Sequence, residues 1–328
     1  MKHIILLGSE RSGSNLLRTL LGKHSHIAAP PPCHFTDAFL PALHRFGNLQ
    51  EKDHATTLLK AMVVLANSSF SQWNLQAEAA AIQEKYQVDC FYKAFAAIYS
   101  EFAQQSGKPG FFCKDNHMHL HAHALLHHNP ATLFIYLYRD PRDQVASWMR
   151  RPLLLHSPLL AANKWKKEQL AISALSRGWG LPLIPVPYEA LVSSPAEVMG
   201  RVLEALSLPI EERCFTTDPA NKESQGNVYW ENLRKPIMKD NFGKYHDILS
   251  GIDIQMIEDA CADVMQTLGY STEFKERKFL YRKLRGKLYE RWIRTRNQFK
   301  AHRLRKRGHH DPFLNKKKLL AEITRLER

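Results

Sequence analysis

A short run of small and basic residues near the N-terminus has the composition of a phosphate-binding turn. Gly8 and Gly13 are separated by four residues, and the run reads Arg11-Ser12-Gly13-Ser14-Asn15. Backbone N–H groups of such a turn point inward, and the dipole of a following helix favours an anion. Ser14 and Asn15 stand where nucleotide hydrolysis needs Lys and then Ser or Thr. The loop therefore predicts phosphate binding without γ-phosphoryl chemistry and without a metal ion.

The segments on either side of this loop predict the elements that hold it. Residues 3–7 form an apolar run that is typical of a buried strand. Leucines recur at helical spacing directly after the loop, at Leu16, Leu17, Leu20 and Leu21. The sequence therefore predicts a strand, a phosphate-binding turn and a helix N-terminus in that order.

A second basic group follows another predicted strand, residues 132–138, which is rich in β-branched and aromatic residues. This run ends in Arg139, and Asp140 and Pro141 are suited to the cap and first position of a helix. Ser147 then lies two turns into that helix. A planar guanidinium gives bidentate contacts to phosphate and a hydroxyl adds a donor, so Arg139 and Ser147 are a candidate phosphate site.

Together these two segments resemble the signatures of the PAPS-dependent sulfotransferases, which use 3′-phosphoadenosine-5′-phosphosulfate (PAPS). The resemblance covers about residues 3–272. It implies an α/β fold of the P-loop type, in which helices flank a central parallel sheet on both sides. It also implies that residues 11–15 bind the 5′-phosphosulfate and that Arg139 and Ser147 bind the 3′-phosphate.

Two weaker matches extend the resemblance toward the C-terminus. Residues 188–191 are similar to the strand end of the family, which would place Tyr188 near the adenine, although packing at a strand end explains a tyrosine equally well. Residues 242–245 resemble the final segment of the family, so Lys244 is a candidate phosphate contact. A solvated lysine is the alternative for Lys244.

Sulfuryl transfer needs a base for the acceptor proton and cations for the charge on the leaving phosphate. Arg11 is the candidate for the leaving group, and Lys114, which matches a family lysine at a strand end, is the candidate for the sulfuryl oxygens. Many relatives carry a glutamate base after the first helix, but residues 29–35 contain no carboxylate. His34 and His117 are the two candidate bases, each against the alternative of a plain loop histidine.

Charge divides the chain of 328 residues unevenly. Residues 275–328 carry 20 Lys and Arg against 5 Asp and Glu, while the whole chain has a net charge of +14. We therefore expect a sulfotransferase domain at residues 1–274 and a basic helical extension at residues 275–328. Residues 36–107 lack the signatures and read as a helical insertion that shapes the acceptor pocket.

The extension predicts an amphipathic basic helix. Its apolar residues recur at helical spacing, at Phe279, Leu280, Leu284, Leu288, Trp292 and Ile293. Three interpretations compete: an anionic membrane surface, a polyanionic substrate or nucleic acid, and packing on the core or a partner. No zinc-finger or RNA-recognition signature appears, which argues against nucleic acid. A further short helix is expected at residues 314–326, and the sequence leaves the oligomeric state open.

The remaining composition bears on compartment and metals. No run of 18 apolar residues exists, and a strand that begins at residue 3 leaves no room for a signal peptide. Five scattered cysteines suggest reduced thiols, so we expect a cytoplasmic protein, with the basic helix as one route to the membrane periphery. The histidines between His117 and His128 are spaced mostly by two, which does not converge on one helix face, and we expect no metal.

The sequence thus predicts an enzyme that moves a sulfuryl group from PAPS to a hydroxyl or amine and releases adenosine 3′,5′-bisphosphate. The acceptor is a glycan, a lipid, a peptide or a small metabolite. One alternative is a degenerate, non-catalytic member of the same fold that binds a nucleotide. A P-loop kinase is the other, and the missing Lys and hydroxyl of its loop count against it.

Overall fold

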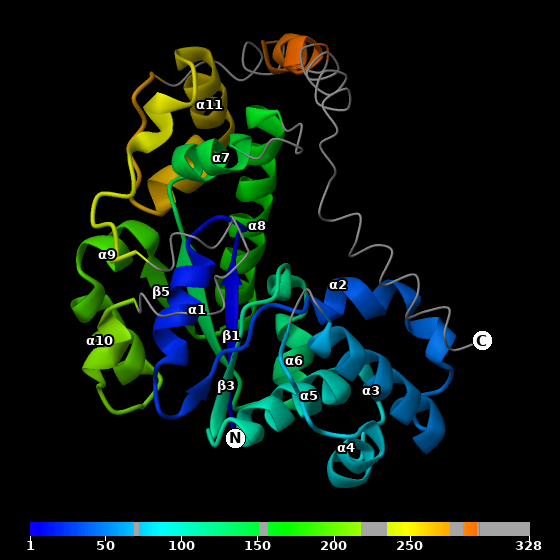
Figure 1. Cartoon of the computed structure of the whole chain (residues 1–328). Coiled ribbons are helices and arrows are strands. Elements are labelled where there is room, and N and C mark those ends of the chain that lie inside the picture. Colours follow the sequence, from blue (N-terminus) through cyan, green and yellow to red (C-terminus); the bar gives the residue numbers. More distant parts are fainter. Residues whose placement is uncertain (69–71, 151–156, 218–234, 276–284, 294, 296–328) are drawn as a thin grey trace, which may run out of the picture.

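The structure is a computed structural model that describes residues 1–68, 72–150, 157–217, 235–275, 285–293 and 295. A five-stranded parallel sheet in the order β2-β3-β1-β4-β5 forms its centre (Figure 1). The strands are β1 (Lys2–Gly8), β2 (Ile27–Ala28), β3 (Gly110–Cys113), β4 (Leu133–Tyr138) and β5 (Leu183–Pro187). The parallel sheet flanked by helices confirms the expected fold class.

Strand β1 is apolar on both faces because helices cover both sides of the sheet. Its neighbours are β3 and β4, and Ile5 lies opposite both Cys113 and Phe134. Successive side chains point to opposite faces, so Ile5 and Leu7 join one buried cluster while Ile4 and Leu6 join another. Since all strands run in one direction, their carboxyl ends and the loops that follow meet at one edge.

Eleven α-helices occur among the described residues before residue 275, and a further helix in the extension is given below. They are α1 (Ser14–Gly22), α2 (Phe35–Phe39), α3 (Lys52–Asn67), α4 (Ala79–Tyr86), α5 (Phe91–Gln105), α6 (Ala122–His128), α7 (Pro141–Met149), α8 (Pro158–Trp179), α9 (Tyr188–Ser193), α10 (Pro195–Ala205) and α11 (Gly251–Thr267). Within the segment 36–107 the described residues are mainly helical, as expected. Phe35, Trp73 and Tyr99 pack edge to face at the centre of this segment.

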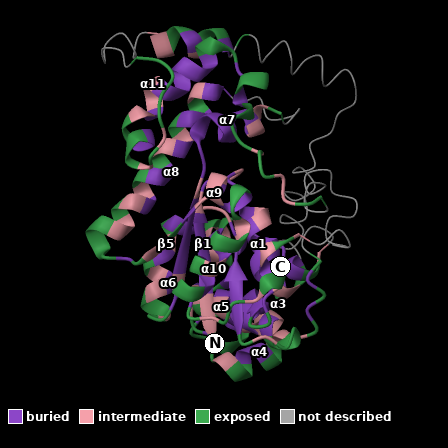
Figure 2. Ribbon diagram, turned by 90° about the vertical axis from the view of Figure 1, so that its left-hand side faces the viewer, coloured by how far each residue is buried: buried purple, intermediate pink, exposed green. Residues whose placement is uncertain are grey.

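Helices α7, α8 and α11 form a layer at the carboxyl end of the sheet. Buried residues line the strands and the facing sides of these helices (Figure 2). Trp165 is fully buried among them and Ile257 packs in the same cluster. Helix α11 begins with a reciprocal capping box between Ser250 and Asp253.

Ser194 and Glu197 have the residue types and spacing of a second capping box, but this box does not form. Helix α10 does begin there, but the Ser194 side chain makes no cap hydrogen bond. Ser194 directly follows α9, and its N–H already donates to the Ala190 carbonyl at 2.8 Å. Glu197 instead lies 4.0 Å from Arg201, one turn farther along α10. The short connection between two helices therefore replaced the expected cap.

The basic extension is described only in part, as a helix over residues 285–293 that we call the tail helix. Tyr289 and Ile293 are buried against Met256 of α11, whereas Leu288 and Trp292 are exposed. Of the expected apolar stripe, Ile293 therefore packs on α11, whereas Leu288 and Trp292 lie on the exposed side of the helix. Phe279, Leu280 and Leu284, the helix expected at residues 314–326 and most of the extension lie outside the described residues.

Two further observations concern composition. All five cysteines are free thiols, and four of them are buried. Among the described residues, no helix combines the length and the apolar character that crossing a membrane requires. The division of the chain at residue 274 stays a prediction.

Candidate functional site

The loop between β1 and α1, residues 8–15, is called the phosphate loop after its expected ligand. Its two glycines, Gly8 and Gly13, are both required by their surroundings. A Cβ on Gly8 would lie 2.4 Å from the carbonyl oxygen of Leu137 in the neighbouring strand. Gly13 has a φ of +91°, and a Cβ there would lie 2.2 Å from the ring of Tyr188. Only glycine lets the chain turn this sharply beneath the aromatic ring. The loop therefore leaves β1 and enters α1 in one fixed geometry.

The N-terminus of α1 is prepared for an anion. Its N-cap is Gly13, no side chain caps the first turn, and no acidic residue lies in that turn. The backbone N–H groups at the start of a helix carry partial positive charge. Ser12 is fully buried and donates to Gln144 of α7 over 3.2 Å, while Ser14 begins the helix. The buried Oδ1 of Asn15 has no hydrogen-bond partner among the described residues.

Arg139 lies directly over the loop, although 128 residues separate it from Arg11. Its guanidinium stacks on the Tyr188 ring with a centroid distance of 4.2 Å. It donates to the carbonyl oxygens of Arg11 at 3.3 Å and of Asn241 at 3.0 Å. Within the described chain, its buried Nε has no partner. Tyr188 therefore positions the arginine and the loop glycine at once.

Ser147 on α7 closes the same site from another side. Its hydroxyl accepts a hydrogen bond from Nε of Arg11 at 3.2 Å. The backbone of Arg139 is in turn fixed by Trp165, whose indole N–H donates to its carbonyl oxygen at 3.2 Å. The two segments that the sequence singled out thus meet at the carboxyl ends of β1 and β4.

Asn241 was not among the sequence candidates, and the structure places it in this group. Its side-chain amide donates to the Tyr188 hydroxyl at 2.7 Å, and its backbone carbonyl oxygen accepts from the Arg139 guanidinium. Lys244 is exposed beside it, with its ammonium 3.4 Å from the Asn241 side chain. The Asp143 carboxylate accepts from the N–H groups of Gly243 and Lys244, which holds this turn on α7. No sequence pattern pointed to Asn241, because its role depends on this long-range contact.

Lys114 follows β3 and reaches the other side of the loop. Burial lowers the pKa of its ammonium to about 8, although Glu10 and Asp115 oppose the shift. The Glu10 carboxylate, within the phosphate loop, accepts from Asn116 at 2.6 Å and from Lys164 at 3.1 Å. Glu10 thereby ties the loop to the strand end after β3 and to α8, a role that the sequence analysis did not assign.

His34 is held by its backbone as well as by its ring. The Asp115 carboxylate accepts from the N–H groups of His34 at 2.8 Å and of Phe35 at 3.1 Å. Nδ1 of the His34 ring accepts from the backbone N–H of Asn116 at 3.3 Å. A neutral ring with that bond carries its proton on Nε2, which then donates and does not accept. His34 could serve as a base at Nε2 only after changing its tautomer.

His117 has the opposite arrangement. Its Nδ1 lies 3.2 Å from the Asp37 carboxylate of α2, which is 80 residues away in the chain. The hydrogen bond and charge of Asp37 raise the pKa of His117, while burial opposes that shift. When Nδ1 donates to Asp37, Nε2 presents a lone pair and can accept a proton. Asp37 is a further residue that the sequence analysis missed. Its position three residues after the candidate base His34 was the signal in the sequence that could have pointed to it.

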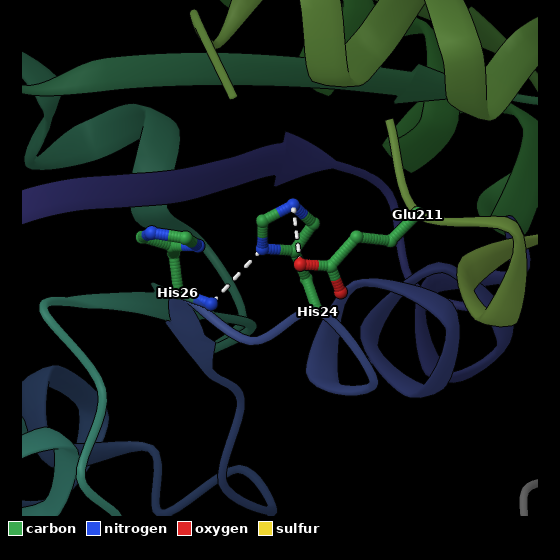
Figure 3. A group of neighbouring side chains, drawn as sticks. All are labelled: His24, His26 and Glu211. Carbon is green, nitrogen blue, oxygen red and sulfur yellow. Dashed lines mark hydrogen bonds and ion pairs between the residues drawn. The ribbon is translucent and has the colours of Figure 1, made fainter. Parts of the chain in front are cut away.

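One group of described residues, His24, His26 and Glu211, brings three potential metal-ligand atoms within 4.8 Å of one another (Figure 3). Nδ1 of His24 accepts from the His26 backbone N–H at 3.0 Å, and Nε2 lies 2.9 Å from the Pro209 carbonyl. Glu211 accepts from the backbone N–H of Ser25 at 3.0 Å. These contacts engage both ring nitrogens of His24 and the Glu211 carboxylate, so the group fastens the chain after α1 to the chain after α10.

Comparison with known proteins matches residues 3–212 to the model of a sulfotransferase family. The sulfotransferase domain of an olefin synthase from Synechococcus is similar in fold, with a TM-score of 0.56 and 20% identity. That alignment covers 83% of this chain and 95% of the other. The sulfotransferase domain of the curacin biosynthetic pathway gives a TM-score of 0.54 at 20% identity, over 83% and 98% of the two chains. Among curated protein sequences there is no match.

Both segments that the sequence analysis expects to contact phosphate, residues 8–15 and 139–147, lie inside the matched region. The shared fold also agrees with the parallel sheet. Since the family model spans well over half of the chain, this protein belongs to the sulfotransferase family.

Proposed function

We propose that this protein transfers a sulfuryl group from PAPS to a hydroxyl or amine of an acceptor. The observation that carries the proposal is the meeting of Arg139 with the phosphate loop. The Arg139 guanidinium lies on Tyr188, beside Gly13, and its buried Nε has no partner among the described residues. An unpaired buried donor is costly, and a phosphate oxygen would satisfy it.

The residues present fit this donor. The α1 N-terminus and residues 12–15 would hold its 5′-phosphate through backbone N–H groups and hydroxyls. Arg139 and Ser147 would hold its 3′-phosphate, and Tyr188 offers an aromatic surface close by. Lys244 stands at the rim, where its exposed ammonium can reach an outer phosphate oxygen. The cations and neutral donors of the site would thus face the negatively charged groups of PAPS.

The reaction would proceed at the side of the loop that faces Lys114 and His117. The acceptor oxygen or nitrogen forms a bond to sulfur, while the bond from sulfur to the bridging phosphate oxygen breaks. Arg11 stabilises the charge on the departing phosphate, and Lys114 stabilises the sulfuryl oxygens. The acceptor proton passes to a base, and adenosine 3′,5′-bisphosphate leaves with the electron pair of the broken bond.

Of the two candidate bases, we assign the role to His117. Asp37 orients its ring, raises its pKa and leaves Nε2 as an acceptor. The backbone N–H of Asn116 places the proton of neutral His34 on Nε2, which is the wrong tautomer for a base at that atom. Asp37 belongs to α2, so the helical segment 36–107 contributes to the acceptor side as a positioning element.

Calorimetric titration with adenosine 3′,5′-bisphosphate, in parallel with Mg-ATP, tests the donor assignment. We expect tight binding of the bisphosphate without a metal and weak binding of ATP. A preference for Mg-ATP would favour a P-loop kinase and overturn the proposal. Transfer of labelled sulfate from PAPS to a panel of glycans, lipids, peptides and small metabolites then tests catalysis. Tight bisphosphate binding without transfer to any acceptor would favour the non-catalytic alternative.

A further inference from the structure

The tail helix is fastened to the protein by one face. Tyr289 and Ile293 are 6% and 1% exposed and pack on Met256 of α11, with Leu159 of α8 beside them. The Tyr289 hydroxyl donates to Asp253 at the start of α11. Arg285 donates to Gln255 at 2.6 Å. This face is a genuine packing contact, so the direction of the opposite face is fixed.

The opposite face is both apolar and basic. Leu288 and Trp292 are 70% and 56% exposed, and Lys287 and Arg291 are exposed as well. With 100° per residue, these four side chains occupy one continuous arc of the helix, with the two apolar residues adjacent and the two cations next to them. A leucine and a tryptophan this exposed on the same arc are not explained by core packing.

The neighbouring helices add to this surface. Ile252 lies in the first turn of α11 and is 55% exposed, next in sequence to Asp253, which binds the tail helix. Leu160 lies in the first turn of α8 and is 53% exposed. It is next in sequence to Leu159, which packs against the tail helix. The two helices that receive the tail helix therefore each expose a large apolar side chain in the turn that lies beside it. We call Leu160, Ile252, Leu288 and Trp292 the apolar corner.

The charges around this corner favour a negatively charged partner. Lys287 and Arg291 form no ion pair within the described chain, whereas the nearby carboxylates are engaged. Asp253 accepts from Tyr289, and Glu290 accepts from the Ser157 hydroxyl. Residues 275–328 also carry 20 Lys and Arg against 5 Asp and Glu. A tryptophan and aliphatic side chains flanked by cations are the composition of a surface that lies in the interface of an anionic bilayer.

We propose that the apolar corner and the cations of the tail helix dock this protein on an anionic lipid surface. The corner lies at the same end of the molecule as α7, toward which β1 runs from the N-terminus (Figure 1). This inference is independent of the proposed sulfuryl transfer, since it concerns residues outside the donor site.

Sedimentation of the full chain with phospholipid vesicles tests the proposal. We expect binding to vesicles of phosphatidylcholine mixed with phosphatidylglycerol and much weaker binding to phosphatidylcholine alone. The double variant Leu288→Ser with Trp292→Ser should bind the anionic vesicles at least about 10-fold more weakly, because two exposed apolar side chains lose their lipid contact. A second variant, Lys287→Gln with Arg291→Gln, should bind more weakly and show a smaller dependence on salt.

Trp179→Ser is the matched control. Trp179 is 67% exposed at the last residue of α8, four residues before β5 begins, and therefore lies at the amino end of the sheet. The Trp179→Ser variant should bind vesicles as the wild type does. The proposal is overturned if the wild type binds no vesicles, if it binds neutral vesicles equally well, or if the Leu288 and Trp292 variant keeps wild-type binding. In that last case the rest of the basic extension would account for binding by itself.

Discussion

The donor side and the acceptor side of the site are built in different ways. The donor side uses backbone geometry at strand ends: a loop after β1, an uncapped α1 and an arginine after β4. The acceptor side uses side chains from separate segments, such as Asp37 of α2 and His117 after β3, which meet only in the folded chain. Local backbone patterns are short and regular, so the donor side is easier to predict from the sequence than the acceptor side.

The difference also separates the two kinds of functional test. A change on the donor side should alter nucleotide affinity or the stability of the loop. A change on the acceptor side should alter the rate of transfer and leave nucleotide affinity intact.

The largest effect is expected from removing the proposed base. His117→Asn should lower the rate of sulfuryl transfer by about 10²- to 10⁴-fold, the usual contribution of a general base. His34→Asn is a matched control, because both histidines have a left-handed backbone, with φ of 59° and 56°, which asparagine tolerates. Affinity for adenosine 3′,5′-bisphosphate should stay unchanged in both variants. A larger rate loss in His34→Asn would transfer the role of base to His34.

On the donor side, the largest effect is expected from replacing Gly13. Gly13→Ala combines a left-handed backbone with a Cβ only 2.2 Å from the Tyr188 ring. We expect a loss of about 2–4 kcal/mol in the free energy of unfolding, together with weaker nucleotide binding. Gly200→Ala is the control, since Gly200 lies in α10 with open space around its Cβ position. Denaturant unfolding measures both, and equal stabilities would show that the loop is not confined by Tyr188.

Arg139→Ala should weaken bisphosphate binding by about 2 kcal/mol, or roughly 30-fold, the scale of a lost charge-assisted hydrogen bond. Binding of adenosine 5′-monophosphate, which lacks the 3′-phosphate, should change much less. Arg201→Ala, an exposed arginine on α10, serves as the control. Calorimetry decides the matter: an unchanged bisphosphate affinity would remove Arg139 from the 3′-phosphate site.

The smallest effect concerns pH. His117 must be neutral to accept a proton, and Asp37 raises its pKa, so the transfer rate should rise with pH through a limb above the ordinary histidine value of about 6.5. Asp37→Asn removes that charge and should move the limb to lower pH. The pKa of Lys114, about 8, predicts a falling limb where its ammonium deprotonates, and the variant should leave it in place. A rising limb that does not move would contradict the pairing of His117 with Asp37.

Much of the donor side could be predicted from the sequence. The strand at residues 3–7, the turn at Gly13 and the helix after it follow from short-range patterns, and the structure forms all three. Asp140 accepts from the Arg142 N–H as the expected cap of α7, with Pro141 at its first position. The strand after which Arg139 stands is also present. These features depend on residues within one or two turns of each other.

The tail helix shows the limit of the same reasoning. Periodicity marked residues 285–293 as part of an amphipathic helix, but several of its arcs contain apolar residues. Contact with α11 selected Tyr289 and Ile293 for burial and left Leu288 and Trp292 outside. A periodic pattern gives the spacing of a face, and the neighbouring helix decides which face it receives.

Short-range patterns predicted the α/β fold, the loop between β1 and α1 and the position of Arg139 at a strand end, because each is encoded by neighbouring residues. The contacts of the folded chain were needed to show that Asn241 binds the Tyr188 hydroxyl, that Glu10 ties the loop to Lys164, and that His117 has a carboxylate partner. Those pairs join residues far apart in the chain, and their geometry exists only once the sheet has brought its strand ends together.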